Sequence, residues 1–378
     1  GVGYISHNDF IEGSYDEMRR AVERLMATDS LKGIVLDYRS NGGGVMQEAV
    51  DIASLVVPRG SRVVSLMGRD SSSLKHLEPR YAPLAESIPV VVLVSNTSAS
   101  ASEILAGALQ DLDRAVIMGS RTYGKGLVQG TRYVGYNGYL KYTTAKYYTP
   151  SGRCVQSRNY ATMRTEGNIT TVPDSLISEF RTRGGRKVYD GKGLMPDIKI
   201  EPDYISSFAV MLYNLGYIED FLDEYVRRNP ELKVDNKSFA ITDEEYDRFG
   251  EFMADKDVPY ESQTRMALEL LQKTSKEERY DSDFADDLKQ IESKLKDQKM
   301  DNLRHYRAEI ADLINSDVVL RHNYFEGVVE YNLRSDSVVM KAVELENYSV
   351  TYTKEAVPAE VKEKLLPLTK SESVERYL

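Results

Sequence analysis

A serine-rich segment, SNTSASASE (Ser95–Glu103), comes directly after the apolar run Val90–Val94. A serine between a strand and a helix lies where backbone N–H groups lack partners and where the helix dipole is positive. That position suits a nucleophile whose attack creates an oxyanion. It equally suits a helix N-cap at Ser98 or Ser100, with Glu103 completing a capping box. From this segment alone, capping is favoured over catalysis.

A glycine-flanked lysine lies further along the chain, in TYGKG (Thr122–Gly126). Glycines on both sides of Lys125 allow a sharp turn and the close approach of other groups. Phosphate binding is one interpretation, but no Ser or Thr follows the lysine as the P-loop pattern requires. The other interpretation is a general base, because a lysine made neutral by burial can accept the proton of a serine.

A run of three glycines in DYRSNGGG (Asp37–Gly44) follows a buried-type strand. Ligands of open α/β sheets bind at the carboxyl ends of the strands, where this run is expected. Bare backbone N–H groups there could form an oxyanion hole together with the amide of Ala101. The alternative is a plain connection between a strand and a helix.

The histidines offer no comparable constellation. His7, His76, His305 and His322 all lie outside the serine segment and the glycine-rich turns. His7 and His76 stay formal candidates for a base, but exposed or structural roles are favoured for all of them. We find no HExxH or similar metal-ligand spacing, so neither a metal nor a cofactor is predicted.

Charge and composition exclude several classes of function. The 378 residues carry a formal net charge of −10, which argues against general nucleic-acid binding. The single cysteine, Cys154, excludes an internal disulfide framework. The longest apolar run, Ile88–Val94, is far shorter than the roughly 20 residues that span a bilayer. Because the chain opens on the strand-like GVGYISH without Met, we expect it to be a fragment of a longer protein.

Strands alternate with helices over the first part of the chain, which indicates an α/β domain with parallel strand pairing. The expected strands are Val2–Ile5, Gly33–Tyr38, Arg62–Met67, Val90–Val94 and Arg114–Gly119. The expected helices are Ser14–Met26 with a Ser14/Glu17 capping box, about Met46–Leu55, and Ser102–Asp111. Beyond Gly126, two strands joined at Asn137-Gly138 predict a hairpin.

The chain becomes helical and highly charged from about Tyr204, so we expect a catalytic domain over 1–203 and a helical domain of unknown role over 204–378. Thr242 and Glu245 occupy capping-box positions. Residues Asp283–Ile314 predict one long amphipathic helix or a pair of helices.

Along the chain, the glycine run comes first, the serine-rich segment second and the glycine-flanked lysine third. Together these three segments resemble the carboxyl-terminal processing (tail-specific) serine peptidases. The matching segments are LDYRSNGGG (Leu36–Gly44), NTSASASEILAGALQD (Asn96–Asp111), GSRTYGKGLVQG (Gly119–Gly130), YYTPSGR (Tyr147–Arg153) and GLMPDI (Gly193–Ile198). The resemblance covers roughly the first half of the chain. It implies an α/β, ClpP/crotonase-like catalytic core with a strand subdomain, followed by a mainly α-helical C-terminal region. Members normally carry a PDZ domain before the core, and the resemblance leads us to expect that this chain begins just after the place where such a domain would end.

The resemblance also assigns residues. It implies that Ser100 is the nucleophile, Lys125 the general base and Gln129 a residue that helps to position the lysine. The oxyanion hole would use the backbone amides of Gly42 or Gly43 and of Ala101. A mainly structural role is implied for Asp111.

The function implied is a serine endopeptidase that cleaves proteins near their C-termini, using a Ser–Lys dyad and an acyl-enzyme. The partners implied are protein or peptide tails, with a homo-oligomer or an envelope partner at the C-terminal helices as a further hypothesis. The location implied is the cell envelope, the periplasm or another exported compartment, with a membrane anchor in the full-length protein as one form. A non-proteolytic binding module is the alternative, and a crotonase-type acyl-CoA enzyme is a third; the presence of both Ser100 and Lys125 favours the peptidase.

Overall fold

The computed structural model of the chain describes residues 1–28, 30–160, 169–201, 204–295 and 299–347. These residues form two compact units, one made of the described residues up to 201 together with 337–347, and the other of the described residues from 204 to 336. The helix α11 (Ser337–Asn347) therefore groups with the first unit although it follows the helical one. The expected division at residue 203 remains a prediction about domains.

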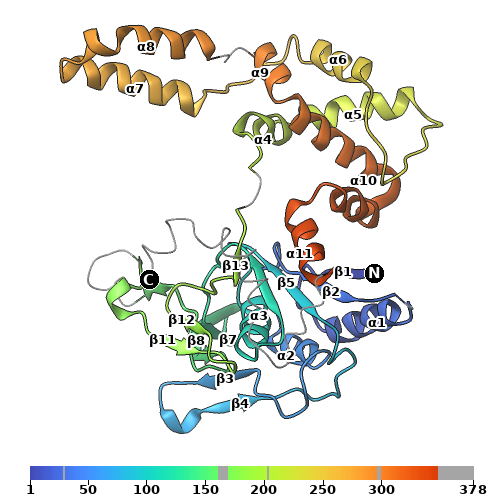
Figure 1. Ribbon diagram of the computed structural model, residues 1–378, viewed down its shortest axis with the longest axis vertical. Coiled ribbons are helices and arrows are strands. Elements are labelled where there is room, and N and C mark those ends of the chain that lie inside the picture. Colours follow the sequence, from blue (N-terminus) through green and yellow to red (C-terminus); the bar gives the residue numbers. More distant parts are fainter. Residues whose placement is uncertain (29, 161–168, 202–203, 296–298, 348–378) are drawn as a thin grey trace. The chain divides into compact units, whose positions relative to one another are not determined.

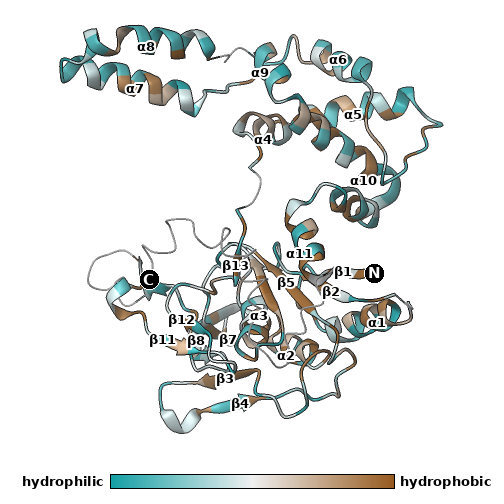
Figure 2. Ribbon diagram, viewed as in Figure 1, coloured by the Kyte–Doolittle hydropathy of each residue, from teal (hydrophilic) through white to brown (hydrophobic). Residues whose placement is uncertain are grey.

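The first unit is built on a parallel sheet of five strands in the order β1-β2-β5-β6-β13 (Figure 1). These strands are β1 (Val2–Ser6), β2 (Gly33–Asp37), β5 (Val90–Val94), β6 (Val116–Gly119) and β13 (Ile198–Lys199). The central strands β2 and β5 are buried along their whole length, as continuous apolar runs predict. Figure 2 shows β5 as one of the most hydrophobic segments of the chain.

Helices cover both faces of this sheet. Ile34, Val92 and Ile117 belong to one buried cluster with side chains of α1 (Ser14–Met26), α2 (Met46–Ala53) and α3 (Ala101–Asp111). Because side chains alternate along a strand, the buried Val35 and Leu93 point to the other face. The helix α11 contacts β2, β5 and β6 and buries apolar side chains of its own, so it covers part of that second face.

A second, antiparallel sheet has the order β4-β3-β8-β7. Its strands are β3 (Val64–Met67), β4 (Lys75–Leu77), β7 (Leu127–Gly135) and β8 (Gly138–Tyr148). The predicted hairpin is confirmed, but its two-residue loop is Tyr136–Asn137, and both residues have positive φ as a type I′ turn requires. Short pairs complete the unit: β9 (Arg158–Asn159) with β10 (Thr170–Thr171), and β11 (Glu179–Arg181) with β12 (Lys187–Tyr189).

The second unit is helical throughout its described elements. These are α4 (Ser207–Asn214), α5 (Tyr217–Arg228), α6 (Asp243–Phe252), α7 (Gln263–Glu277), α8 (Asp281–Lys294), α9 (Lys299–His305) and α10 (Arg307–Leu333). Its core gathers aromatic and aliphatic side chains of α4, α5, α6, α9 and α10, while α8 is largely hydrophilic (Figure 2). Among the described helices, none is both long and apolar enough to cross a membrane.

Two helix predictions need correction and one is confirmed. The Ser14/Glu17 capping box is wrong: Gly13, in a left-handed conformation, is the N-cap of α1, and the Ser14 hydroxyl accepts from Ile11 N–H instead. The stretch Asp283–Ile314 holds parts of α8 and α10 and the whole of α9 rather than one or two helices. The Thr242 cap of α6 is confirmed, because its side chain accepts from Glu245 N–H.

Candidate active site

Ser100 lies at the sharp turn between β5 and α3. It is the N-cap residue of α3, with φ 57° and ψ −111°, a backbone conformation that side-chain-bearing residues rarely adopt. Such strain costs on the order of 1–3 kcal/mol and concentrates at active sites. Neighbouring serines secure the turn: Ser98 Oγ donates to Tyr38 O at 2.7 Å, and Ser102 Oγ donates to Asn41 O at 2.9 Å. Ser98 and Ser102 thus support the turn, while Ser100, and not Ser98, is the N-cap of α3.

Glu103 joins the serine turn to the lysine loop. Its Oε2 accepts from the backbone N–H groups of Ser100 at 3.0 Å and Lys125 at 2.8 Å. Its Oε1 accepts from Gly124 N–H at 2.7 Å and from Thr122 Oγ1 at 2.5 Å. The side chain is fully buried, and burial raises the pKa of Glu103 although these hydrogen bonds act in the opposite direction. One buried carboxylate thus holds the two predicted catalytic segments together.

The glycine run packs against the same turn. A Cβ on Gly43, whose φ is +102°, would lie 2.6 Å from Ala99 O and 3.0 Å from Ala101 N, so only glycine fits there. The Gly43 N–H donates to Asn41 Oδ1 at 2.8 Å. Within the described part of the chain, the Gly42 and Ala101 N–H groups have no such partner. Of the two glycines predicted for an oxyanion hole, Gly42 is therefore the one whose backbone N–H is available to donate to an oxyanion.

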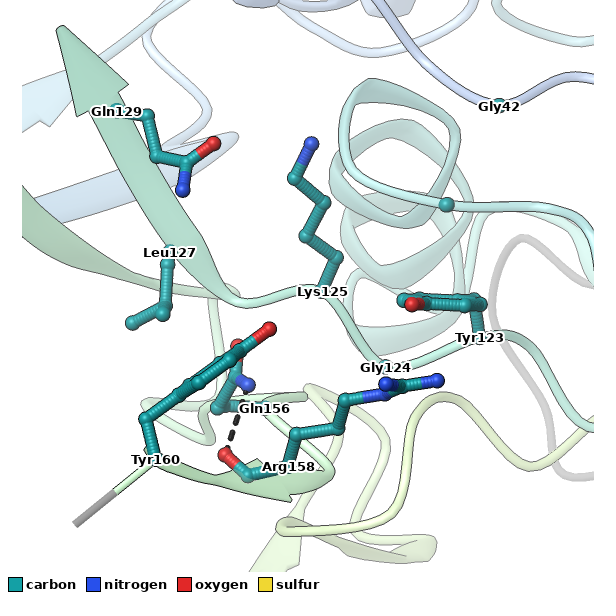
Figure 3. A pocket seen from close by; sticks show the side chains of 10 residues that line it. Gly42, Tyr123, Gly124, Lys125, Leu127, Gln129, Gln156, Arg158 and Tyr160 are labelled. Atoms are coloured by element: carbon teal, nitrogen blue, oxygen red, sulfur yellow. Dashed lines mark hydrogen bonds between the residues drawn. The ribbon is translucent and has the colours of Figure 1, made fainter. Parts of the chain in front are cut away.

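Lys125 and Gln129 line a cavity of about 310 Å³ beside this turn. In Figure 3 the lysine side chain rises from its loop into the cavity, between the Gln129 amide and the backbone at Gly42. The lysine is half-buried. The lining residues are Gly42, Ala99, Tyr123, Gly124, Lys125, Leu127, Gln129, Gln156, Arg158 and Tyr160.

The predicted residues are assembled in one place, but not every expected contact is formed. Among the hydrogen bonds of the described residues, none joins the Ser100 hydroxyl to the Lys125 amine or Lys125 to Gln129. Ser100 is connected to Lys125 through Glu103. Tyr147 adds a further support, because its hydroxyl donates to Ser100 O at 3.3 Å.

Asp111 ends α3 on the side away from Ser100. It forms a fully buried ion pair with Arg153, with 2.8 Å between Oδ1 and the guanidinium, and its Oδ2 accepts from Ser151 N–H at 3.0 Å. These contacts hold the turn Thr149–Arg153 against the end of α3. The geometry fits the structural role that the sequence indicates.

His7 lies near the glycine run but not in the cavity. Asn41 Nδ2 donates to His7 O at 2.8 Å, and the imidazole packs edge-on against Phe10 and Tyr38. Burial lowers the pKa of His7. No group of three or more His, Cys, Asp or Glu side chains in the described regions is placed to hold a metal ion.

Sequence reasoning missed the link made by Glu103 and the side chains of Tyr123 and Arg158. Glu103 was assigned only to a capping box, and it forms one with Ser100. The sequence did contain a signal for this role of Glu103, because the residue lies in the otherwise apolar stretch ASEILAGAL. A carboxylate that is buried with the rest of a helix needs several hydrogen-bond donors. No comparable signal marks Arg158, which lies on a strand of only two residues.

Comparison with known proteins follows the division of the chain. Residues 1–169 match the family model described as Peptidase family S41, and residues 208–345 match that of Probable PDZ-protease, C-terminal helical domain. The second match covers the region to which sequence reasoning gave no role.

Individual relatives match the first region. The chain is 40% identical over 158 residues to the carboxy-terminal-processing protease of Bartonella bacilliformis, covering 41% of this chain and 36% of the relative. It is 39% identical over 158 residues to a probable CtpA-like serine protease of Staphylococcus aureus, covering 42% and 32%. The solved structure of a photosystem II D1 C-terminal processing protease is 28% identical, with a TM-score of 0.41. The match covers 54% of this chain and 44% of that chain. The chain thus matches about a third of the length of these curated relatives.

Proposed function

Because residues 1–169 match the model of peptidase family S41, we propose that the protein is a serine endopeptidase that cleaves protein substrates near their C-termini. The observation that carries this proposal is Glu103, whose carboxylate ties the backbone of Ser100 to that of Lys125. A strained serine, a lysine in a cavity and unpartnered N–H groups then occupy one site.

In the proposed reaction, Ser100 Oγ attacks the scissile carbonyl and Lys125, in its neutral form, accepts the hydroxyl proton. The N–H groups of Gly42 and Ala101 donate to the oxyanion, and each such donor is worth about 3 kcal/mol. Lys125 returns the proton to the leaving amine, and water then releases the acyl group from Ser100.

Gln129 would orient the lysine amine in this reaction. Its side chain lines the same cavity from β7, and both side chains can rotate about their staggered torsions. The contact is therefore expected when substrate occupies the site, as apo geometries of catalytic hydrogen bonds are commonly long.

The proposal is tested with Ser100→Ala and Lys125→Ala in the full-length protein. Both variants should lose at least about 1,000-fold in the cleavage rate of an unfolded substrate, with wild-type products mapping near its C-terminus by mass spectrometry. Matched controls are Ser72→Ala and Lys141→Ala, which alter exposed side chains outside the cavity. Cleavage by Ser100→Ala at the wild-type rate would exclude this nucleophile, and a folded wild-type protein that binds peptides without cleaving any would favour a binding module.

A further inference from the structure

The cavity beside Lys125 has an uneven charge. The described residues that line it include two cationic side chains, Lys125 and Arg158, and among them there is no Asp or Glu. The chain as a whole carries a net charge of −10, so this local excess of positive charge departs from the character of the molecule. A local group of cations favours an anionic ligand independently of the net charge.

Arg158 is oriented by an aromatic ring. Its guanidinium carbon lies 5.2 Å from the centroid of the Tyr123 ring, and Figure 3 shows the arginine side chain extending from its strand to Tyr123 across the floor of the cavity. Stacking on a ring leaves the N–H donors in the guanidinium plane available for a planar acceptor. Within the described residues, no ion pair of Arg158 is present.

The backbone that carries Arg158 is fixed to the lysine loop. The Gln156 side chain accepts from Gly126 N–H at 2.7 Å and donates to Arg158 O at 2.9 Å. In addition, Ser157 N–H donates to Gly124 O at 2.9 Å. These bonds bracket Lys125, so Arg158 is held at a defined place relative to the proposed base.

We propose that Arg158 is a specificity-determining residue that binds a carboxylate of the substrate. The guanidinium fork matches a carboxylate in a bidentate arrangement, which distinguishes it from a neutral amide of the same shape. The inference rests on the proposed peptidase function. The carboxylate has two sources, an acidic side chain close to the scissile bond or the C-terminal carboxylate of the substrate, and the test separates them.

Four peptides test the inference, and they share one sequence except at a single residue and at the C-terminal group. That residue, near the scissile bond, is Glu or Gln, and each of the two peptides is made with a free or an amidated C-terminus. Wild-type protein should prefer the peptide with the recognised carboxylate by about tenfold in kcat/KM, mainly through KM, as a charge-assisted contact at a partly exposed site predicts. A preference for Glu over Gln among amidated peptides identifies a side chain, and a preference for acid over amide among Gln peptides identifies the C-terminus.

Variants at Arg158 then assign the preference to this residue. Arg158→Gln should cleave all four peptides at similar rates, and Arg158→Lys should retain only part of the preference because it keeps the charge and loses the fork. The control is Arg132→Gln, which removes the same charge from an exposed position on β7 outside the cavity and should leave the preference intact.

Binding measurements separate this inference from the proposed function. Fluorescence anisotropy of the same labelled peptides with Ser100→Ala, alone and combined with Arg158→Gln, reports carboxylate recognition without turnover. Equal affinities for all four peptides, or a preference that survives Arg158→Gln, would overturn the role of Arg158. Failure of the folded wild-type protein to cleave any peptide would instead overturn the peptidase assignment, while the binding preference still decides the role of Arg158.

Discussion

Replacing Glu103 by Gln keeps the shape of the side chain and removes one of its two acceptor oxygens. If the amide nitrogen takes the place of Oε2, it meets two backbone N–H donors, those of Ser100 and Lys125. If it takes the place of Oε1, it meets Gly124 N–H and the hydroxyl of Thr122, which can turn to accept. The second orientation leaves a single backbone N–H unpaired and is therefore the cheaper one.

One buried N–H without an acceptor costs about 1–3 kcal/mol, and we expect Glu103→Gln to lose that amount of unfolding free energy. Glu103→Ala leaves all four donors unpaired and should lose more. Because Glu103 holds the backbones of Ser100 and Lys125, kcat should fall in both variants while KM changes less.

Urea unfolding followed by circular dichroism gives the loss in stability, and peptide cleavage below the unfolding transition gives the kinetic effect. Glu12→Gln is the matched control, since it makes the same chemical change at an exposed position. If Glu103→Gln unfolds at the wild-type midpoint and keeps the wild-type kcat, the carboxylate does not hold the two segments in place and the reasoning fails.

Further predictions concern the surroundings of the site. Gly43→Ala should lower kcat/KM by about 100-fold, because its Cβ would displace the nucleophile turn, whereas Gly42→Ala, with open space around its Cβ, should keep most activity; equal losses in the two variants would contradict this. Since burial lowers the pKa of His7, its contribution to stability is complete above the ordinary pKa of about 6.5 and is lost as pH falls toward the lowered value. Unfolding at about pH 7 and about pH 5 should therefore show a smaller loss of stability in His7→Phe than in wild type, and identical losses would exclude this role of His7. Asp111→Asn breaks the buried pair with Arg153 and should cost about 3–5 kcal/mol of unfolding free energy; a loss below about 1 kcal/mol, the range of exposed pairs, would show that the pair contributes little.

Local patterns in the sequence predicted the local structure well. Continuous apolar runs identified β2 and β5 as buried strands, and helical spacing identified α1 and α3, because each pattern reflects one element and its immediate burial. The cap of α1 was wrong because Ser14 forms a different local bond, which a Ser-x-x-Glu pattern does not distinguish.

Interactions between distant segments were harder to predict. The serine, lysine and glycine segments could be identified because each contains an unusual local composition. The convergence of donors from residues 100, 122, 124 and 125 on Glu103 depends on the fold, and nothing in the residues themselves specifies it. The same holds for α11, because its sequence does not indicate which unit it packs against.

The packing of α11 has a consequence for biosynthesis. A ribosome completes β1 through β13 some 140 residues before it reaches Ser337. Until that helix emerges, one face of the parallel sheet, including Val35 and Leu93, lacks this cover. The first unit is therefore discontinuous in sequence, and the last helix that packs on its sheet is synthesised only after the helical unit.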